Sequence, residues 1–140
     1  MKVFIDANIF VDIFNPRRVN HKYSLDTYQY LVKNKFEIFT SCDLITTIYY
    51  IDSKQNKTQA LLNIININKT LKILDFSNQE VEQTCELMLA DSDYNDLEDT
   101  LQYVMARKTN CDIIISNDAK FISKGIEVLT SKKFYDKFIR

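Results

Sequence analysis

The stretch KVFIDANIF, residues 2–10, indicates the fold most directly. KVFID (2–6) is mostly apolar and β-favouring, which predicts a buried strand with Asp6 at its carboxyl end. ANIFVDIFN (7–15) predicts a short helix directly behind it. A single acid at a strand end is explained well enough as a cap for the following helix. Its importance therefore depends on which other carboxylates lie beside it in the fold.

The rest of the chain alternates between strand patterns and helix patterns. Further strands are predicted over residues 36–40, 71–76, 112–116 and, at an edge, 127–130. Helices are predicted over residues 23–34, 41–52, 57–68, 77–89 and 97–108, with a short helix closing the chain. A strand is the alternative for 41–52, which is rich in β-branched residues. We expect one α/β domain over 1–140, with a parallel sheet and helices on both faces.

Composition excludes several classes of function. The chain is 46% hydrophobic and 26% charged, with a net charge of −1, so it is globular and has no overall basic field to attract nucleic acid. Gly and Pro occur once each, which argues against a Rossmann fingerprint or a P-loop and leaves turns to Asn, Asp, Ser and Lys. A single His and three scattered Cys predict no zinc site and reduced, mostly buried thiols. Without a long apolar run, we expect a soluble, cytoplasmic protein.

Three acids are expected to meet at one edge of this sheet. Asp6 ends the first strand, Asp118 follows the strand at 112–116, and Asp99 lies in the first turn of the helix that precedes that strand. Ligands bind at the carboxyl ends of strands in such sheets. Clustered carboxylates repel one another, and a divalent cation removes that penalty. Oxygen ligands suit Mg²⁺ or Mn²⁺, which would activate water for attack on a phosphodiester.

Each acid also has a purely structural alternative. Asp6 can cap the following helix. Asp96 can be the N-cap of the next helix, with Asp99 as a first-turn acid favoured by the helix dipole. The segment SND at 116–118 can be a simple Asx-type turn. The combination at three carboxyl-edge positions, rather than any one acid, is the argument for a site.

The ordered blocks VFIDANIFVDIF, DLEDTLQYVMARKTNCDIIIS and ISNDAKF resemble those of the PIN-domain ribonucleases, especially the small bacterial VapC-like toxins. The resemblance covers nearly the whole chain. It implies a metal-dependent RNA endonuclease that leaves 5′-phosphate and 3′-hydroxyl ends, with Asp6, Asp99 and Asp118 as ligands and Asn8 and Ser116 as supporting residues. It also implies a homodimer and a protein antitoxin that occupies the groove of the toxin.

The sequence departs from that family at one position. The family usually carries a Glu on the helix after the second strand, and the matching residue here is Thr47. A Thr can hydrogen-bond a ligand or water but adds no charge. Asp43, one turn earlier, could compensate, although capping of the helix is its expected role. Glu98 and Asp96 are further candidates near Asp99.

The loop at 15–22 carries the strongest basic patch. Arg17, Arg18 and Lys22 follow Asp6 closely in sequence, and we expect them to bind RNA phosphates; an ordinary solvated loop is the alternative. Two other functions stay open. One is a PIN-like module that binds RNA or a protein without cleavage, as Thr47 suggests. The other is a small-molecule or receiver-like α/β domain whose acidic edge binds magnesium.

Overall fold

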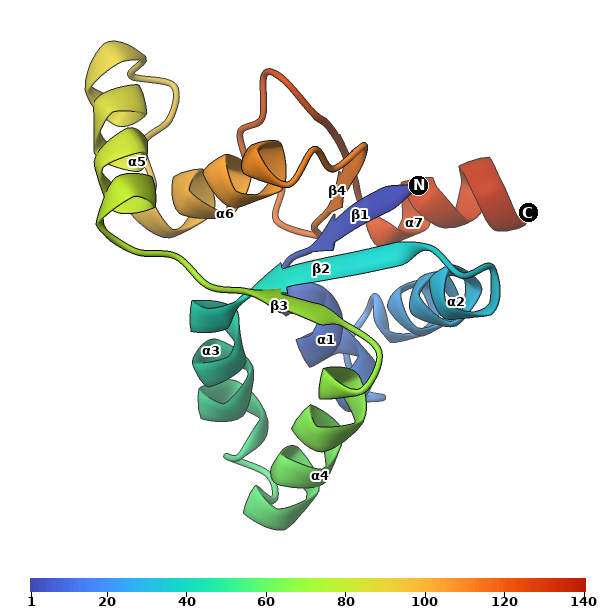
Figure 1. Ribbon diagram of the computed structural model, residues 1–140. Coiled ribbons are helices and arrows are strands. Elements are labelled where there is room, and N and C mark those ends of the chain that lie inside the picture. The colour runs from blue at the N-terminus through green and yellow to red at the C-terminus, as the bar shows by residue number, and fades with distance from the viewer.

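Five short strands form one sheet in the computed structural model, which describes all 140 residues. The strand order is β3-β2-β1-β4-β5, and every neighbouring pair is parallel (Figure 1). The strands are β1 Lys2–Ile5, β2 Glu37–Ser41, β3 Lys72–Leu74, β4 Ile113–Ile115 and β5 Glu127–Leu129. The predicted edge strand at 127–130 is therefore confirmed as β5.

Helices cover both faces of the sheet, as predicted. The helices are α1 Ala7–Phe14, α2 His21–Lys33, α3 Cys42–Asp52, α4 Lys57–Asn68, α5 Asn78–Ala90, α6 Leu97–Lys108 and α7 Ser131–Phe134, followed by a π-helical turn, Tyr135–Ile139. The helices α5 and α6 lie on one face, and α3 and α4 on the other (Figure 1). No helix combines the length and the apolar character needed to span a membrane.

The segment 41–52 is helical because its apolar residues are spaced for one helix face. Leu44 and Ile48, four residues apart, are both fully buried. This spacing outweighs the β-propensity of the branched residues, since a strand would place both on one face but bring polar Thr46 there too.

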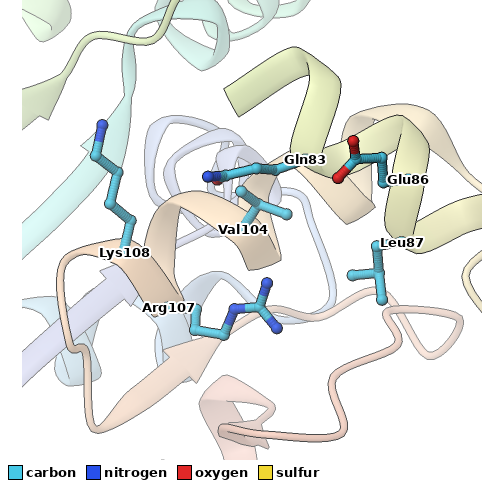
Figure 2. Close-up of a pocket in the computed structure, with 6 residues that line it drawn as sticks. All are labelled: Gln83, Glu86, Leu87, Val104, Arg107 and Lys108. Atoms are coloured by element: carbon cyan, nitrogen blue, oxygen red, sulfur yellow. The ribbon is translucent and has the colours of Figure 1, made fainter. Parts of the chain in front are cut away.

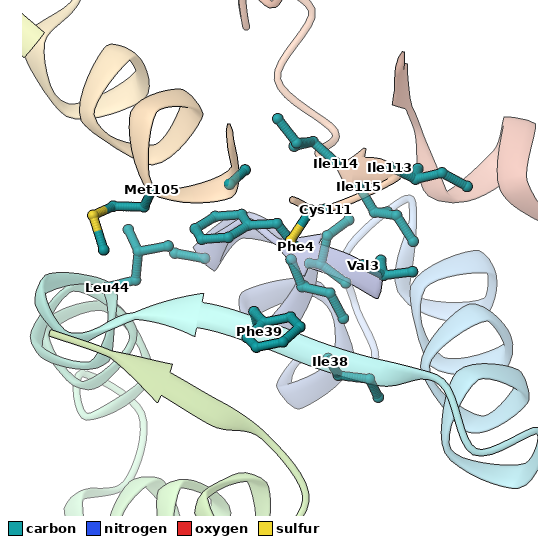
Figure 3. Close-up of a cluster of buried hydrophobic side chains, with 14 of the residues drawn as sticks. Val3, Phe4, Ile38, Phe39, Leu44, Met105, Cys111, Ile113, Ile114 and Ile115 are labelled. Atoms are coloured by element: carbon teal, nitrogen blue, oxygen red, sulfur yellow. The ribbon is translucent and has the colours of Figure 1, made fainter. Parts of the chain in front are cut away.

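The core lies on both sides of the central strands. Val3, Phe4 and Ile5 of β1 have no exposed surface, and the neighbouring strands β2 and β4 place Phe39 and Ile114 beside them. Figure 3 shows Val3, Phe4, Phe39 and Ile114 together with Leu44 of α3 and Met105 of α6. Strands buried on both faces read as continuous apolar runs, which is why KVFID and DIIIS were recognisable in the sequence.

The expectation that the thiols are mostly buried is wrong. Cys42 and Cys85 are exposed and only Cys111 is buried, so most of the thiols face solvent. The helix α5 buries Glu80 and Thr84, and Cys85 therefore points away from the core.

Two helices end without glycine. Lys35, just after α2, has a φ of 58°, and Asn110, just after α6, has a φ of 60°. These left-handed conformations allow the chain to leave a helix, and glycine usually adopts them. The prediction that Asn and Lys take over turn positions in this glycine-poor chain is confirmed at both.

Candidate active site at the carboxyl edge of the sheet

The candidate site lies where the strand order of the sheet reverses direction. From β1 the chain proceeds outward to β2 and β3, then returns across the sheet to β4 on the other side of β1. Ligands bind at such switch points, outside the carboxyl ends of the strands. Ile5 and Ile115 are paired in register, and the backbone N–H of Asp6 donates to the carbonyl of Ile115 at 3.0 Å. The residues that follow β1 and β4 are therefore neighbours.

Asp6 is held by both of these segments. Its Oδ1 accepts a hydrogen bond from the backbone N–H of Ala7 at 2.8 Å, so it caps α1 as the structural alternative expected. Its Oδ2 accepts from the Ser116 hydroxyl at 2.7 Å and from the Asn8 amide at 3.2 Å. Burial raises the pKa of the Asp6 carboxyl; the bonds from Ser116 and Ala7 oppose this, and the nearby charge of Asp118 adds to it.

Asp99 approaches the same place from the start of α6. Asp96 is the N-cap of this helix, as predicted, and its Oδ1 accepts from the backbone N–H of Asp99 at 2.9 Å. Burial, as the largest cause, and the charges of Asp6, Asp96 and Asp118 together raise the pKa of Asp99 to about 7. An aspartate that holds its proton near neutral pH lies in a site where negative charge is crowded.

One pocket of about 180 Å³ joins these acids. The residues that line it are Asp6, Ala7, Asn8, Val11, Arg18, Thr47, Ile51, Glu98, Asp99 and Asp118. The structure thus brings together the three aspartates that the sequence placed at one edge, along with two of the four supporting residues. Ser116 reaches the pocket through its bond to Asp6, and Asp96 contributes through the helix cap.

The donor set of this pocket fits a hard divalent cation. Every acidic ligand candidate offers oxygen. Burial, with the charges of neighbouring carboxylates adding to it, raises the pKa of Asp6, Glu98 and Asp99, and a bound cation would favour their charged forms. In their present orientations, however, no three His, Cys, Asp or Glu side chains are grouped closely enough to hold one metal ion. The ligands needed for Mg²⁺ or Mn²⁺ are present, but they do not form a closed cage.

Acids near Thr47 are arranged differently from the expectation. Asp43 is not the cap of α3, because Ser41 is its N-cap. Instead, the Asp43 carboxylate accepts from the amide of the fully buried Gln102 at 3.0 Å and from the Ser41 hydroxyl. Asp43 does not line the pocket, whereas Glu98 does. Burial and the charges of Asp43 and Asp6 raise the pKa of Glu98.

The basic residues of the loop separate in the structure. Arg18 lines the acidic pocket, whereas Arg17 and Lys22 do not. Lys22 is 80% exposed and forms an ion pair with Asp26 at 2.8 Å, one turn along α2. Of the three residues expected to bind RNA, only Arg18 therefore stands at the site.

A larger pocket lies elsewhere but lacks comparable chemistry. It measures about 600 Å³ between α5 and α6 and is lined by Gln83, Glu86, Leu87, Val104, Arg107 and Lys108 (Figure 2). Its charged residues are one acid, Glu86, and two bases, Arg107 and Lys108, and no residue of a strand lines it. Size alone does not make it the better candidate.

Two polar residues that matter to this edge were not recognised as such in the sequence. Asp12 of α1 is only 3% exposed, and its Oδ2 accepts from the Asn117 amide at 2.7 Å. The backbone N–H of Asn117 in turn donates to the Asn8 side chain at 3.0 Å. An acid between apolar Val11 and Ile13 in a buried helix was the available signal, since such an acid needs partners.

Comparisons with known proteins agree with this geometry. A family model described as the PIN domain matches residues 2–120. Ribonuclease VapC1 of Aquifex aeolicus (strain VF5) is 51% identical over 137 residues, which cover 98% of this chain and 95% of that protein. Both findings confirm the resemblance that the sequence blocks indicated.

Solved structures of low sequence identity share the fold. In the crystal structure of VapBC2 from Rickettsia felis bound to a promoter DNA fragment, the matching chain has a TM-score of 0.73 at 21% identity, with 93% of this chain and 98% of that one covered. Mycobacterium tuberculosis VapC20, a sarcin–ricin loop cleaving toxin, gives a TM-score of 0.66 at 14% identity, with 87% and 98% covered.

Proposed function

The chain belongs to the PIN-domain family, and we propose that it is a divalent-metal-dependent endoribonuclease that hydrolyses RNA phosphodiester bonds. The observation that carries this proposal is the convergence of Asp6, Asp99 and Asp118 on one pocket from the ends of β1, α6 and β4. Its 51% identity to a ribonuclease over almost the whole chain supports the same chemistry.

Asp6, Asp99 and Asp118 would hold a Mg²⁺ or Mn²⁺ ion. Such an ion, when bound, supplies a more acidic water and stabilises charge on the phosphodiester. The resemblance to the family implies that the products would carry 5′-phosphate and 3′-hydroxyl ends. The chain's own residues prepare the site. Ser116 and Asn8 both donate to Oδ2 of Asp6 and fix its orientation, as polar partners of metal ligands commonly do.

Two further residues act at the rim of the pocket. Arg18 presents a guanidinium beside the aspartates, where it can bind a phosphate oxygen of the RNA. Thr47 offers a hydroxyl in place of the Glu that the family usually carries. The pocket therefore has one negative charge fewer than is usual in the family, and a second metal ion would bind more weakly.

We extend the proposal to a toxin of a toxin–antitoxin pair that works in the cytoplasm as a homodimer. The support is the similarity to a protein named VapC1 and to the VapBC2 assembly of Rickettsia felis. A protein antitoxin would then bind this chain and block its site. Co-expression with the product of the neighbouring reading frame, followed by purification of the complex, tests the pairing.

The alternative is a PIN-like module that binds RNA or a protein without cleaving RNA. Two observations favour it: Thr47 replaces a charged residue, and the acids are not grouped into a closed cage. Calorimetry with Mn²⁺ separates the two functions, because a nuclease must bind the ion. No heat of binding at millimolar Mn²⁺ would support the alternative.

Cleavage of a fluorescent single-stranded RNA tests the proposed activity directly. We expect cleavage with Mg²⁺ or Mn²⁺, none with a chelator, and a loss of about a hundredfold or more for Asp6→Asn or Asp99→Asn. Asp93→Asn is the matched control, because Asp93 lies in an exposed ion pair with Lys124 outside the pocket. Full activity in both site variants would refute the assignment.

A further inference from the structure

A buried carboxylate lies directly behind the candidate active site. Asp12 is one turn beyond Asn8 on α1, and its side chain is 4% exposed. Both of its oxygens have partners: Oδ1 accepts from Nε of Arg18 at 2.7 Å, and Oδ2 accepts from Asn117 at 2.7 Å and from Ser24 at 3.3 Å. A buried charge is tolerated only when it is paired and hydrogen-bonded in this way.

Arg18 is held at one end and free at the other. Only its Nε is engaged, since no hydrogen bond or ion pair involves its terminal Nη atoms. Its side chain is 43% exposed and lines the pocket with Asp6, Asp99 and Asp118. The guanidinium thus keeps its terminal N–H donors available beside the acids, in the planar geometry that suits phosphate oxygens.

Asn117 fixes the other side of the same carboxylate. Its amide nitrogen donates to Asp12, while its Oδ1 accepts from the backbone N–H of Ser131 at 2.9 Å and from the Ser131 hydroxyl at 3.1 Å. Asp12 therefore lies between the loop that carries Arg18 and the segment after β4 that carries Asp118. Asp12→Asn would replace one acceptor oxygen with an N–H₂ group, which would then face either the Nε–H of Arg18 or the amide N–H of Asn117. Only a carboxylate accepts from both of these donors.

An exposed arginine on a loop normally loses much rotamer freedom when it binds phosphate. A buried anchor at Nε removes part of that cost before the substrate arrives. We propose that Asp12 is a positioning residue that fixes the guanidinium of Arg18 beside the acidic pocket, so that its terminal N–H groups bind a phosphate of the RNA substrate. This inference rests on the proposed nuclease function.

A double-mutant cycle tests whether Asp12 acts through Arg18. Asp12→Asn, Arg18→Ala and the double variant are compared for RNA binding in chelator, by fluorescence anisotropy, and for kcat and KM with Mn²⁺. We expect each single variant to raise the RNA Kd and KM about tenfold with a smaller change in kcat, and the double variant to be no worse than Arg18→Ala. Asp112→Asn, at the opposite end of β4, is the control.

The outcomes separate this inference from the function on which it rests. A wild type that neither binds nor cuts RNA overturns both. If the wild type binds and cuts RNA, but the losses of RNA affinity in the two single variants multiply in the double variant, the positioning role alone is overturned. Independent effects add as free energies, so multiplied losses would mean that Asp12 does not act through Arg18.

A second measurement needs no variant of Asp12 and covers the case in which Asp12→Asn does not fold. The Nε–H of Arg18, assigned by its absence in Arg18→Lys, is compared by ¹⁵N NMR with the Nε–H of Arg17, which has no side-chain partner. We expect the Arg18 proton to exchange with solvent at least about tenfold more slowly. Equal exchange rates would overturn the inference.

Discussion

The hydroxyl oxygen of Ser116 lies 2.7 Å from Oδ2 of Asp6, although the two residues are 110 positions apart in the sequence. This bond joins the segment after β4 to the segment after β1. It directs one carboxylate oxygen of Asp6 and helps to keep its pKa from rising further under burial. The orientation of the acid therefore depends on the pairing of two parallel strands.

Removing that hydroxyl tests its role. Ser116→Ala leaves Asp6 buried with one donor fewer, and we expect Mn²⁺ affinity and RNA cleavage to fall about 10–100-fold, with about 1 kcal/mol of stability lost. Calorimetry and cleavage assays measure the two effects. Ser92→Ala, in an exposed turn, is the control. Unchanged metal affinity in Ser116→Ala would show that the bond does not orient a ligand.

The pKa of Asp99 predicts how stability depends on pH without metal. Its folded pKa, about 7, exceeds its ordinary value of 3.8, so the folded state binds the proton more tightly than the unfolded state. Its contribution to the free energy of unfolding therefore falls as the pH rises from about 4 to about 7. Denaturant titrations in chelator at pH 5 and pH 8 should show a smaller decrease for Asp99→Asn than for the wild type. Equal decreases would contradict the prediction.

Restoring the family's acid on α3 should strengthen the site. Thr47→Glu adds a carboxylate to a pocket that Thr47 already lines, and we expect Mn²⁺ affinity to rise about tenfold because ligand charge tunes affinity. Thr46→Glu is the control, since Thr46 is exposed and does not line that pocket. Weaker Mn²⁺ binding in Thr47→Glu would mean that position 47 does not face the ion.

The left-handed residue after α2 limits stability. Lys35 has a φ of 58°, a left-handed conformation that costs a non-glycine residue about 1–2 kcal/mol. Glycine adopts this conformation without that cost, but its greater freedom in the unfolded chain offsets the gain by about 0.5–1 kcal/mol. We expect Lys35→Gly to stabilise the fold by about 0.5–1 kcal/mol in urea denaturation. Gln29→Gly, inside the same helix, should destabilise it by about 1 kcal/mol. A destabilised Lys35→Gly would contradict this account of the turn.

Most of the fold could be predicted because its signals are local. Helix α4 begins and ends where the periodicity over 57–68 indicated, and the capping box of Ser77 and Glu80 begins α5. The convergence of Asp6, Asp99 and Asp118 followed from one topological rule about strand ends. Their positions could be predicted, but the directions of their side chains could not, because these depend on rotamers and neighbours.

The contacts that Asp12 makes with Arg18 and Asn117 could not be predicted from the sequence. Arg18 lies six residues away and could have been considered as a partner, but Asn117 is 105 residues distant and meets Asp12 only because β1 and β4 are adjacent. The exposed Cys42 and Cys85 were misjudged because composition does not say which face of a helix a thiol occupies. Long-range polar contacts and helix orientation are properties of the assembled fold.

The central claim is that Asp6, Asp99 and Asp118 bind one hard cation. A crystal of the wild type grown with Mn²⁺, examined by anomalous scattering at the manganese edge, tests it most directly. We predict a single strong peak in the pocket, with an oxygen of each aspartate about 2.0–2.3 Å away after the side chains turn toward it. An anomalous peak elsewhere, or none at millimolar Mn²⁺, would contradict the metal-dependent nuclease.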